Sequence, residues 1–317
     1  MEEDKQLQTF ETDENHHGQR LDVYLSEIYE GRSRSFFQKL IKAGHVKING
    51  IPASKTGVSV CYGDIVEVLI PQAESVEIKA ENIPLDILYE DDDVLIVNKP
   101  KNMVVHPAAG HYSGTLVNAV MYHCADSLSG INGQTRPGIV HRIDKDTTGA
   151  LIVCKNDASH ICLAQQIKEH TVTRKYIGIV CGQVSTDSGI INKPIGRHPA
   201  DRKKMAVNEK NGRNAITHYK VLERFDKYTF MEFKLETGRT HQIRVHMGSI
   251  GHPLLGDELY GNPKDKLTYM SDGQTLHAAV IGFIHPSSRE YMEFEAPIPE
   301  YLNNILIKLR KIDANMP

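Results

Sequence analysis

The chain has few cysteines and no fingerprint of a metal or nucleotide site. Its five cysteines are scattered and form no C-x-x-C pair, which argues against a disulfide framework and against a zinc site. Neither an H-E-x-x-H motif nor the glycine pattern of a Rossmann or P-loop site occurs. We therefore expect a cytoplasmic protein with reduced thiols, no metal and no cofactor.

The chain also lacks a long apolar run and a basic overall charge. No apolar stretch approaches the roughly 18 residues that span a bilayer, and residues 1–14 are acidic, so we expect neither an anchor nor a signal peptide. The net charge is −3, but residues 1–14 and 72–93 are strongly acidic and the remainder is net positive. Residues 197–213 carry six Lys or Arg and two acids. Such a patch fits a nucleic-acid partner and equally an ordinary solvated surface.

Composition and pattern predict four segments. Residues 1–17 are expected to be an acidic flexible tail, and residues 18–72 a small α/β module. Residues 73–93 are acidic and contain proline, which indicates a linker. Residues 94–317 form the expected main domain.

Helical spacing in the N-terminal module is followed by strand patterns. Apolar residues share one helix face over 21–28, and a second helix is expected from a serine N-cap at 33 to a glycine at 44. Residues 46–51 contain an Asn-Gly pair, the signal of a type I′ hairpin, and residues 63–70 alternate as a strand.

Short strands dominate the main domain, with two clear helices among them. The helices are expected over 159–168 and 240–249, the second capped by Thr240. The clearest strands are 94–97, 138–143, 150–153, 176–180, 215–225 and 228–236. Short turns join many of these strands. This predicts an α+β fold with a mixed, mostly antiparallel sheet and flanking helices.

The run His141-Arg142-Ile143-Asp144-Lys145-Asp146-Thr147-Thr148-Gly149 is the most informative stretch. Apolar, β-branched segments flank it, which predicts a loop between strands, a setting that suits reactive groups. An alternative is a tight turn in which Asp and Thr side chains cap the backbone. Calcium is excluded, because the fifth ligand position of the calcium-loop pattern is Thr148 and the twelfth is Lys155.

This run resembles the H-R-L-D-x-x-T-S/T-G signature of the RluA-type pseudouridine synthases. Further segments of the family pattern occur in the same order: 98–100 with 105–107, 174–176, 238–246 and 276–278. Segments 194–199 and 202–207 are similar to the RluD branch. The resemblance covers nearly all of the chain from about residue 18. Ile143 and Ala150 are the mild departures from the signature.

The resemblance implies roles for five residues. Asp144 would act at the sugar of the target uridine, with Arg244 as its ion-pair partner. Tyr176 would stack on the base and assist a late proton transfer, and Leu276 would form an apolar floor. Arg142 would fill the space that a flipped base leaves. The alternatives remain open: a structural or phosphate-binding Arg244, a Tyr176 that only packs, and an Arg142 that only contacts phosphate.

Several further residues are expected to contact RNA or line the site. The N-terminal module resembles the S-four-type RNA-binding domain, named for a small-subunit ribosomal protein. Its expected phosphate contacts are Arg32, Arg34, Lys39, Lys42 and Lys47. In the main domain we expect contacts from Arg197, Arg202 and Lys203, and we interpret His141 as hydrogen-bonding scaffold beside the substrate. The alternative for the module is a helical cap with ordinary surface lysines.

The resemblance predicts a monomeric enzyme that isomerises uridine to pseudouridine in large-subunit ribosomal RNA after flipping the target base. Asp144 could either attack C1′ or remove a proton from C2′. A first alternative is a non-catalytic RNA-binding factor of ribosome assembly with the same fold. A second is a glycosidase, but this requires another carboxylate about 5–10 Å from the first, and the sequence shows no local candidate.

Overall fold

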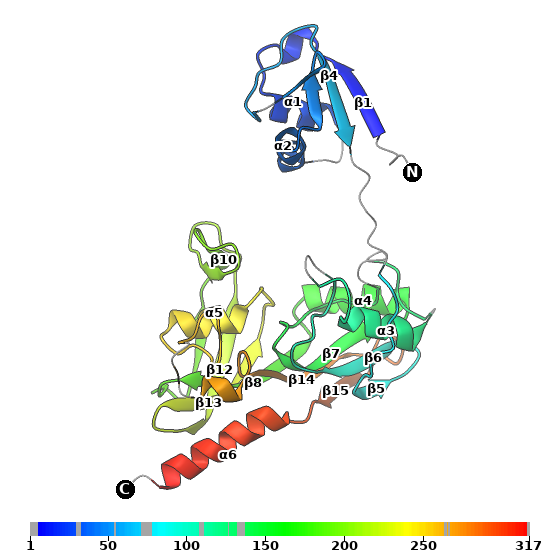
Figure 1. The fold of residues 1–317 in the computed structure, drawn as a ribbon. Coiled ribbons are helices and arrows are strands. Elements are labelled where there is room, and N and C mark those ends of the chain that lie inside the picture. The colour runs from blue at the N-terminus through cyan, green and yellow to red at the C-terminus, as the bar shows by residue number, and fades with distance from the viewer. Residues whose placement is uncertain are drawn as a thin grey trace. The chain divides into compact units, whose positions relative to one another are not determined.

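Two compact units make up the chain, Met1–Val76 and Glu77–Pro317. The computed structural model describes residues 6–29, 33–53, 55–70, 78–107, 111–125, 127–131, 137–262, 265 and 267–315 (Figure 1). Over these residues, no helix combines the length and the apolar character needed to cross a membrane.

The N-terminal unit packs two helices on an antiparallel sheet of order β1-β4-β2-β3. Asn49 and Gly50 both have positive φ, 52° and 80°, and form the expected type I′ turn between β2 and β3. Leu25 and Phe37, one from each helix, are fully buried in the core of this unit. The elements are β1 (Gln6–Glu11), η1 (Glu14–His16), α1 (Leu21–Ile28), α2 (Arg34–Lys42), β2 (Val46–Ile48), β3 (Ile51–Pro52) and β4 (Ile65–Ile70).

The prediction of a flexible tail over residues 1–17 is wrong for its second half. Gln6–Glu11 forms β1, which pairs along the whole of β4, and Phe10 packs against the core. Asp13 then caps the short helix η1 by accepting a hydrogen bond from the N–H of His16 at 3.1 Å. An edge strand held by backbone hydrogen bonds needs little apolar sequence, so the acidic composition of residues 1–14 as a whole hid β1.

The larger unit is built on a nine-stranded sheet of order β5-β6-β7-β14-β8-β13-β12-β9, with β15 paired to β14. Only β7 and β14 pair in parallel among the described strands; all other neighbours are antiparallel. The strands are β5 (Ile87–Glu90), β6 (Val94–Lys99), β7 (Thr148–Cys154), β8 (Thr173–Cys181), β9 (Ser188–Asn192), β12 (Ile216–Arg224), β13 (Tyr228–Leu235), β14 (Leu276–Ile284) and β15 (Tyr291–Glu295). A separate hairpin consists of β10 (Ile195–Arg197) and β11 (Met205–Val207).

Helices cover both faces of this sheet. Alternation along β7 sends Leu151 toward the apolar cluster that contains α3 and α5, and Ile152 toward the cluster that contains α4. The helix α6 packs on β8 and β13 from the side opposite α5. The predicted α+β class with a mostly antiparallel sheet is confirmed. The helices are α3 (Leu116–Cys124), α4 (Asp157–Lys168), α5 (Gln242–Ser249), η2 (Thr268–Met270) and α6 (Glu300–Ala314).

The strand expected over 138–143 is not formed. Ile139 makes one isolated bridge to Val153, and residues 141–145 have no regular structure. Gly138 turns the chain with φ 70°, and a Cβ there would lie 2.7 Å from the carbonyl oxygen of Cys154. After the bridge to Val153, the segment continues as an irregular loop to the start of β7.

The linker expected over 73–93 is also partly wrong. Residues 71–77 lie outside the described residues, and Ile87–Glu90 already forms β5. Asp91 builds the β5–β6 turn, because its Oδ1 accepts hydrogen bonds from the N–H groups of Asp93 and Val94, both at 2.8 Å. Asp91 is therefore a turn-forming residue and not part of a linker.

Candidate active site

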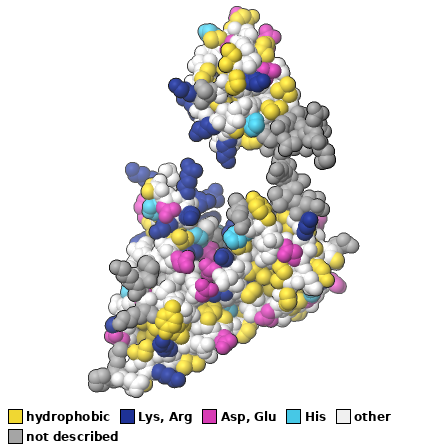
Figure 2. Space-filling view, viewed as in Figure 1, with side chains coloured by type: hydrophobic (Ala, Val, Ile, Leu, Met, Phe, Trp, Pro, Cys, Tyr) yellow, Lys and Arg dark blue, Asp and Glu magenta, His cyan; other side chains and the backbone are white. Residues whose placement is uncertain are grey.

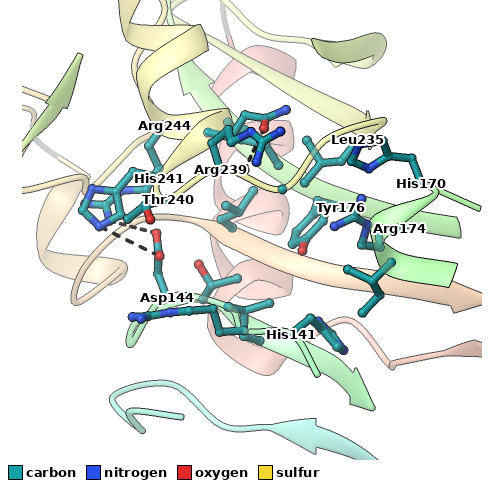
Figure 3. A pocket seen from close by; sticks show the side chains of 18 of the residues that line it. His141, Asp144, His170, Arg174, Tyr176, Leu235, Arg239, Thr240, His241 and Arg244 are labelled. Carbon is teal, nitrogen blue, oxygen red and sulfur yellow. Dashed lines mark hydrogen bonds and ion pairs between the residues drawn. The ribbon is translucent and has the colours of Figure 1, made fainter. Parts of the chain in front are cut away.

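A cavity of about 500 Å³ opens on the sheet face that carries α3 and α5 (Figure 3). Its walls come from the loop before β7, from β8, from the β13–α5 loop and from α5. The volume lies within the range of small-ligand pockets, about 300–1,000 Å³. Six residues singled out from the sequence line it: His141, Arg142, Asp144, Tyr176, Arg244 and Leu276.

Asp144 is held from one side by a buried arginine. Arg244 Nη1 donates a hydrogen bond to Asp144 Oδ2 at 3.0 Å, and the side chains of Arg244 and Asp144 are 7% and 19% exposed. Arg244 is in turn fixed by the fully buried Asp257, which accepts from Nε at 2.7 Å and from Nη2 at 2.9 Å. Burial alone would lower the pKa of Arg244, but the two carboxylates raise it well above its usual range. The guanidinium is thus a permanent cation beside Asp144.

The start of α5 differs from the prediction. Thr240 is not the N-cap; His241 occupies that position in the left-handed conformation, with φ 56° and no side-chain cap bond. This conformation turns the ring of His241 toward the site, where Nε2 lies 3.9 Å from Asp144 Oδ1. The hydroxyl of Tyr260 accepts the N–H of Met205 at 2.8 Å and lies 2.9 Å from His241 Nδ1, which fixes the ring. Burial lowers the pKa of His241 and favours the neutral ring.

Two features fix the loop that carries Asp144. Gly149 has φ 110°, and a Cβ there would lie 2.2 Å from the carbonyl oxygen of Ala278, so only glycine lets β7 approach β14 so closely. Lys99 is fully buried, and its Nζ donates to the carbonyl oxygens of Pro100, Met103 and Lys145 at 2.7, 2.9 and 2.9 Å. The last of these carbonyls belongs to the residue directly after Asp144.

Tyr176 and Leu276 supply the apolar part of the wall. Both are nearly buried, on the neighbouring strands β8 and β14. Burial raises the pKa of Tyr176, so its hydroxyl stays protonated at neutral pH. No hydrogen-bond partner of this hydroxyl is found in the part of the chain that the structure describes, and it faces the cavity (Figure 3).

His141 and Arg142 occupy the loop just before Asp144. His141 Nε2 accepts the N–H of Ile152 at 2.9 Å, and burial lowers the pKa of His141 to about 3, so the ring is neutral with its proton on Nδ1. It is a hydrogen-bonding support, in line with its interpretation as scaffold. The side chain of Arg142 is exposed at the rim of the cavity.

The cavity is strongly cationic. Its lining contains five Lys or Arg side chains and a single carboxylate, Asp144. Asp146, the other acid of the signature run, does not line it. Among the described residues, no group of three or more His, Cys, Asp or Glu is placed to hold a metal ion. The arrangement therefore suits an anionic ligand that meets one ionised carboxylate.

The remaining RNA-contact candidates lie outside the cavity. Arg197, Arg202 and Lys203 are exposed on the β10–β11 hairpin, where Figure 2 shows Lys and Arg side chains gathered. In the N-terminal unit, Arg34 donates to the buried Asp22 at 2.9 Å and is about half exposed, so it also links the two helices. Arg32 lies outside the described residues. The three remaining candidates, Lys39, Lys42 and Lys47, are exposed.

Asp257 and Arg174 are charged residues of the site to which the sequence assigned no role. Asp257 follows a glycine in a loop without a distinctive pattern, and only the fold brings it to Arg244. Arg174 lies two residues before Tyr176 on β8 and also lines the cavity. Strand alternation was the available signal for Arg174, since positions two apart share a face.

Comparisons with known proteins place the chain among RNA-modifying enzymes. A family described as RNA pseudouridylate synthase matches residues 93–249, and the S4 domain matches residues 19–66. An uncharacterized RNA pseudouridine synthase of Bacillus subtilis (strain 168) is 52% identical over 298 residues, which cover 94% of this chain and 96% of that protein. Ribosomal large subunit pseudouridine synthase D of Zymomonas mobilis is 44% identical over 304 residues, or 93% and 95% of the two chains. The solved structure of human RNA pseudouridylate synthase domain containing 1 is similar, with TM-score 0.55, 25% identity and coverage of 75% of this chain and 97% of that one.

Proposed function

Because the chain belongs to the RNA pseudouridylate synthase family and is therefore an isomerase, we propose that it converts uridine to pseudouridine in large-subunit ribosomal RNA, with Asp144 acting at the sugar. The family expected from the sequence is confirmed. Several relatives named ribosomal large subunit pseudouridine synthase D, at 41–44% identity over most of the chain, support this substrate.

The position of Asp144 carries the catalytic part of this proposal. It is the single carboxylate of a cationic cavity, and Arg244 Nη1 donates a hydrogen bond to it at 3.0 Å. A carboxylate can attack an anomeric carbon, as in glycoside hydrolysis, or remove a neighbouring proton. Asp144 would therefore form a bond to C1′ or take the proton from C2′, and either step detaches uracil.

The apolar wall supports a role in holding the base. The ring of Tyr176 and the side chain of Leu276 present flat and apolar surface beside Asp144. An aromatic ring can stack on a base that has been taken out of the RNA helix. The hydroxyl of Tyr176 would then be in reach of the proton that must leave C5 after the new bond forms.

The cationic surfaces support binding of a phosphate backbone. The exposed basic residues of the β10–β11 hairpin and of the N-terminal unit would contact phosphates and position the RNA. Arg142, exposed at the rim, would occupy the gap left by the flipped uridine. These residues would bind and position the RNA and would take no part in the bond changes at the uridine.

Mapping pseudouridine on unmodified transcripts tests the proposal. The purified chain would be incubated with large-subunit rRNA, small-subunit rRNA and tRNA transcripts, and modified positions would be mapped at nucleotide resolution. We expect pseudouridine at discrete uridines of the large-subunit transcript. Modification confined to another transcript would reject the substrate, and no modification of any of them by folded protein would count against the activity.

A further inference from the structure

Arg174 is a buried cation without a carboxylate partner among the described residues. Its side chain is 6% exposed, and Nη2 donates only to the carbonyl oxygen of Glu236 at 3.2 Å, while Nε has no partner in the described part of the chain. The ionisable neighbours that influence the guanidinium are Tyr176, whose hydroxyl is protonated at neutral pH, and another arginine, Arg239. Arg244 at the other end of the cavity is, by contrast, paired with two carboxylates.

The fold makes specific room for this guanidinium. A Cβ on Gly238 would lie 2.6 Å from Arg174 Nη1, so the glycine of the β13–α5 loop leaves the space that the arginine fills. In Figure 3, Arg174 and His170 lie on the opposite side of Tyr176 from Asp144 and Arg244. The hydroxyl of Tyr176 is influenced by the charges of both Arg174 and Asp144, which agrees with a position between them.

An unpaired buried guanidinium is costly, because its desolvation is not offset by a counter-charge. One hydrogen bond to a backbone carbonyl does not offset it. Arg174 lines the cavity, so a negative charge that arises in the cavity would supply the missing partner. The question is which anion forms there.

We propose that Arg174 stabilises the negative charge on uracil when its bond to the sugar breaks. This inference rests on the proposed function. When the N1–C1′ bond breaks, both electrons stay on uracil and spread over N1, O2 and O4, whether Asp144 bonds to C1′ or the C2′ proton leaves. The C5–C1′ bond then forms as the Asp144–C1′ bond breaks or as the proton returns to C2′, and C5 loses its proton, so the charge exists only between the two steps.

Geometry favours the base over a phosphate as the partner of Arg174. With C1′ at Asp144 and the ring against Tyr176, the far edge of uracil points toward Arg174. Arg174 and Tyr176 are two residues apart on one face of β8, about 7 Å along the strand, which matches the reach of a single base. The phosphates attach to the sugar, at the Asp144 end, and remain near solvent.

Single-turnover rates on two RNAs test this role. The RNAs carry uridine or 5-fluorouridine at the target, and the fluorine makes detached uracil a weaker base that needs less stabilisation. The rate measured is that of N1–C1′ bond cleavage, because 5-fluorouridine has no C5 proton to lose and cannot complete the reaction. We expect Arg174→Gln to slow conversion of the uridine RNA about 100-fold at saturating enzyme. The loss on the 5-fluorouridine RNA should be clearly smaller, and the Kd for RNA should change less than about twofold.

Two further variants complete the experiment. Arg174→Lys keeps the charge but loses the planar donor set. We therefore expect an intermediate loss of rate, which is also smaller on the 5-fluorouridine RNA. This variant replaces Arg174→Gln in the test if Arg174→Gln does not fold. Lys175→Gln removes a charge from the opposite face of the same strand and should stay within about twofold of wild type on both RNAs. Equal losses on both RNAs would overturn the proposal, and so would a loss confined to Kd and its salt dependence, which indicates a phosphate contact. Absence of activity in the wild type would instead reject the proposed function.

Discussion

Arg244 Nη1 lies 3.0 Å from Asp144 Oδ2, and the two residues are 100 positions apart in the sequence. Arg244 uses its other donor edge for Asp257, with bonds of 2.7 and 2.9 Å. These two bonds restrain the guanidinium of Arg244 in one orientation. The carboxylate of Asp144, which it binds, therefore also has a fixed orientation. The pair therefore provides an oriented carboxylate oxygen at the wall of the cavity.

Asp144→Asn should abolish turnover and leave RNA binding nearly intact. The amide is isosteric but is neither a nucleophile nor a base, and we expect a loss of at least about 1,000-fold in kcat. Pseudouridine formation on a target transcript measures the first effect, and Kd from filter binding measures the second. Activity close to that of wild type would end the catalytic assignment of Asp144.

Asp257→Asn should weaken the support of Arg244 and so disturb the position of Asp144. The amide has one acceptor oxygen where the carboxylate has two, and it carries no charge. Arg244 therefore loses its charged partner, and Asp144 loses the fixed guanidinium that orients it. We expect unfolding in urea to show a loss of about 1–3 kcal/mol in stability, with kcat reduced at least about tenfold and KM little changed. Glu258→Gln, at the exposed neighbouring position, is the matched control and should leave both quantities unchanged.

The sequence predicted the proposed catalytic residues better than the residues that support them. Asp144, Tyr176 and Arg244 lie in segments with a family pattern, and the fold gathers them at one cavity. Asp257 has no such pattern, because its role depends on meeting Arg244 in space. The αL conformation of His241 was also hidden, since residue type alone favours Thr240 as the cap.

The fold was predictable where apolar periodicity was strong. Both helices of the N-terminal unit and the strand at 228–236 follow their patterns closely. The strand β1 was missed because backbone pairing with β4 needs no apolar face. Residues 138–143 look like a strand by composition, but only Ile139 bridges β7, and the residues after it leave the sheet; apolar composition does not show where the pairing stops.

Lys99 should make stability depend on pH. Burial lowers the pKa of Lys99 to about 7 in the folded chain, against about 10.4 when unfolded. The unfolded state thus binds more protons between about pH 7 and 10.4, and stability from this group rises with pH across that window. The stability of wild type relative to Lys99→Met, measured by urea unfolding, should increase by about 2 kcal/mol from pH 7 to pH 9. A constant difference would mean that the three carbonyl oxygens hold the ammonium form throughout.

Removing three charges from the N-terminal unit should weaken RNA binding without slowing the chemistry. Lys39, Lys42 and Lys47 are exposed, and removal of each lysine–phosphate ion pair lowers the slope of log K against log salt by about 0.7–0.9. The triple Lys→Gln variant should therefore reduce that slope by up to about 2–3 and keep its rate at saturating RNA. A control that changes the exposed Lys220, Lys227 and Lys311 to Gln should keep the slope. Equal slopes for the two variants would show that this unit is not an RNA-binding arm.

The role proposed for Arg142 makes a prediction about RNA structure. Its side chain is exposed at the cavity rim two residues before Asp144, where a planar guanidinium can both stack on bases and bond phosphate. Flipping a base from a stacked helix costs a few kcal/mol, and much less from an unpaired strand. A side chain that fills the vacated space offsets this cost only where there is a stack to open.

Arg142→Ala should therefore slow pseudouridine formation much more on a structured stem-loop than on a short unstructured oligonucleotide with the same uridine. Single-turnover rates at saturating enzyme isolate this effect from binding, and we expect a difference of about tenfold between the two losses, equivalent to about 1.4 kcal/mol of the flipping cost. A simple phosphate contact would instead weaken both RNAs alike, and its effect would fade as the salt concentration rises. Equal rate losses on the two RNAs would reject the wedge and leave Arg142 as a contact to the backbone.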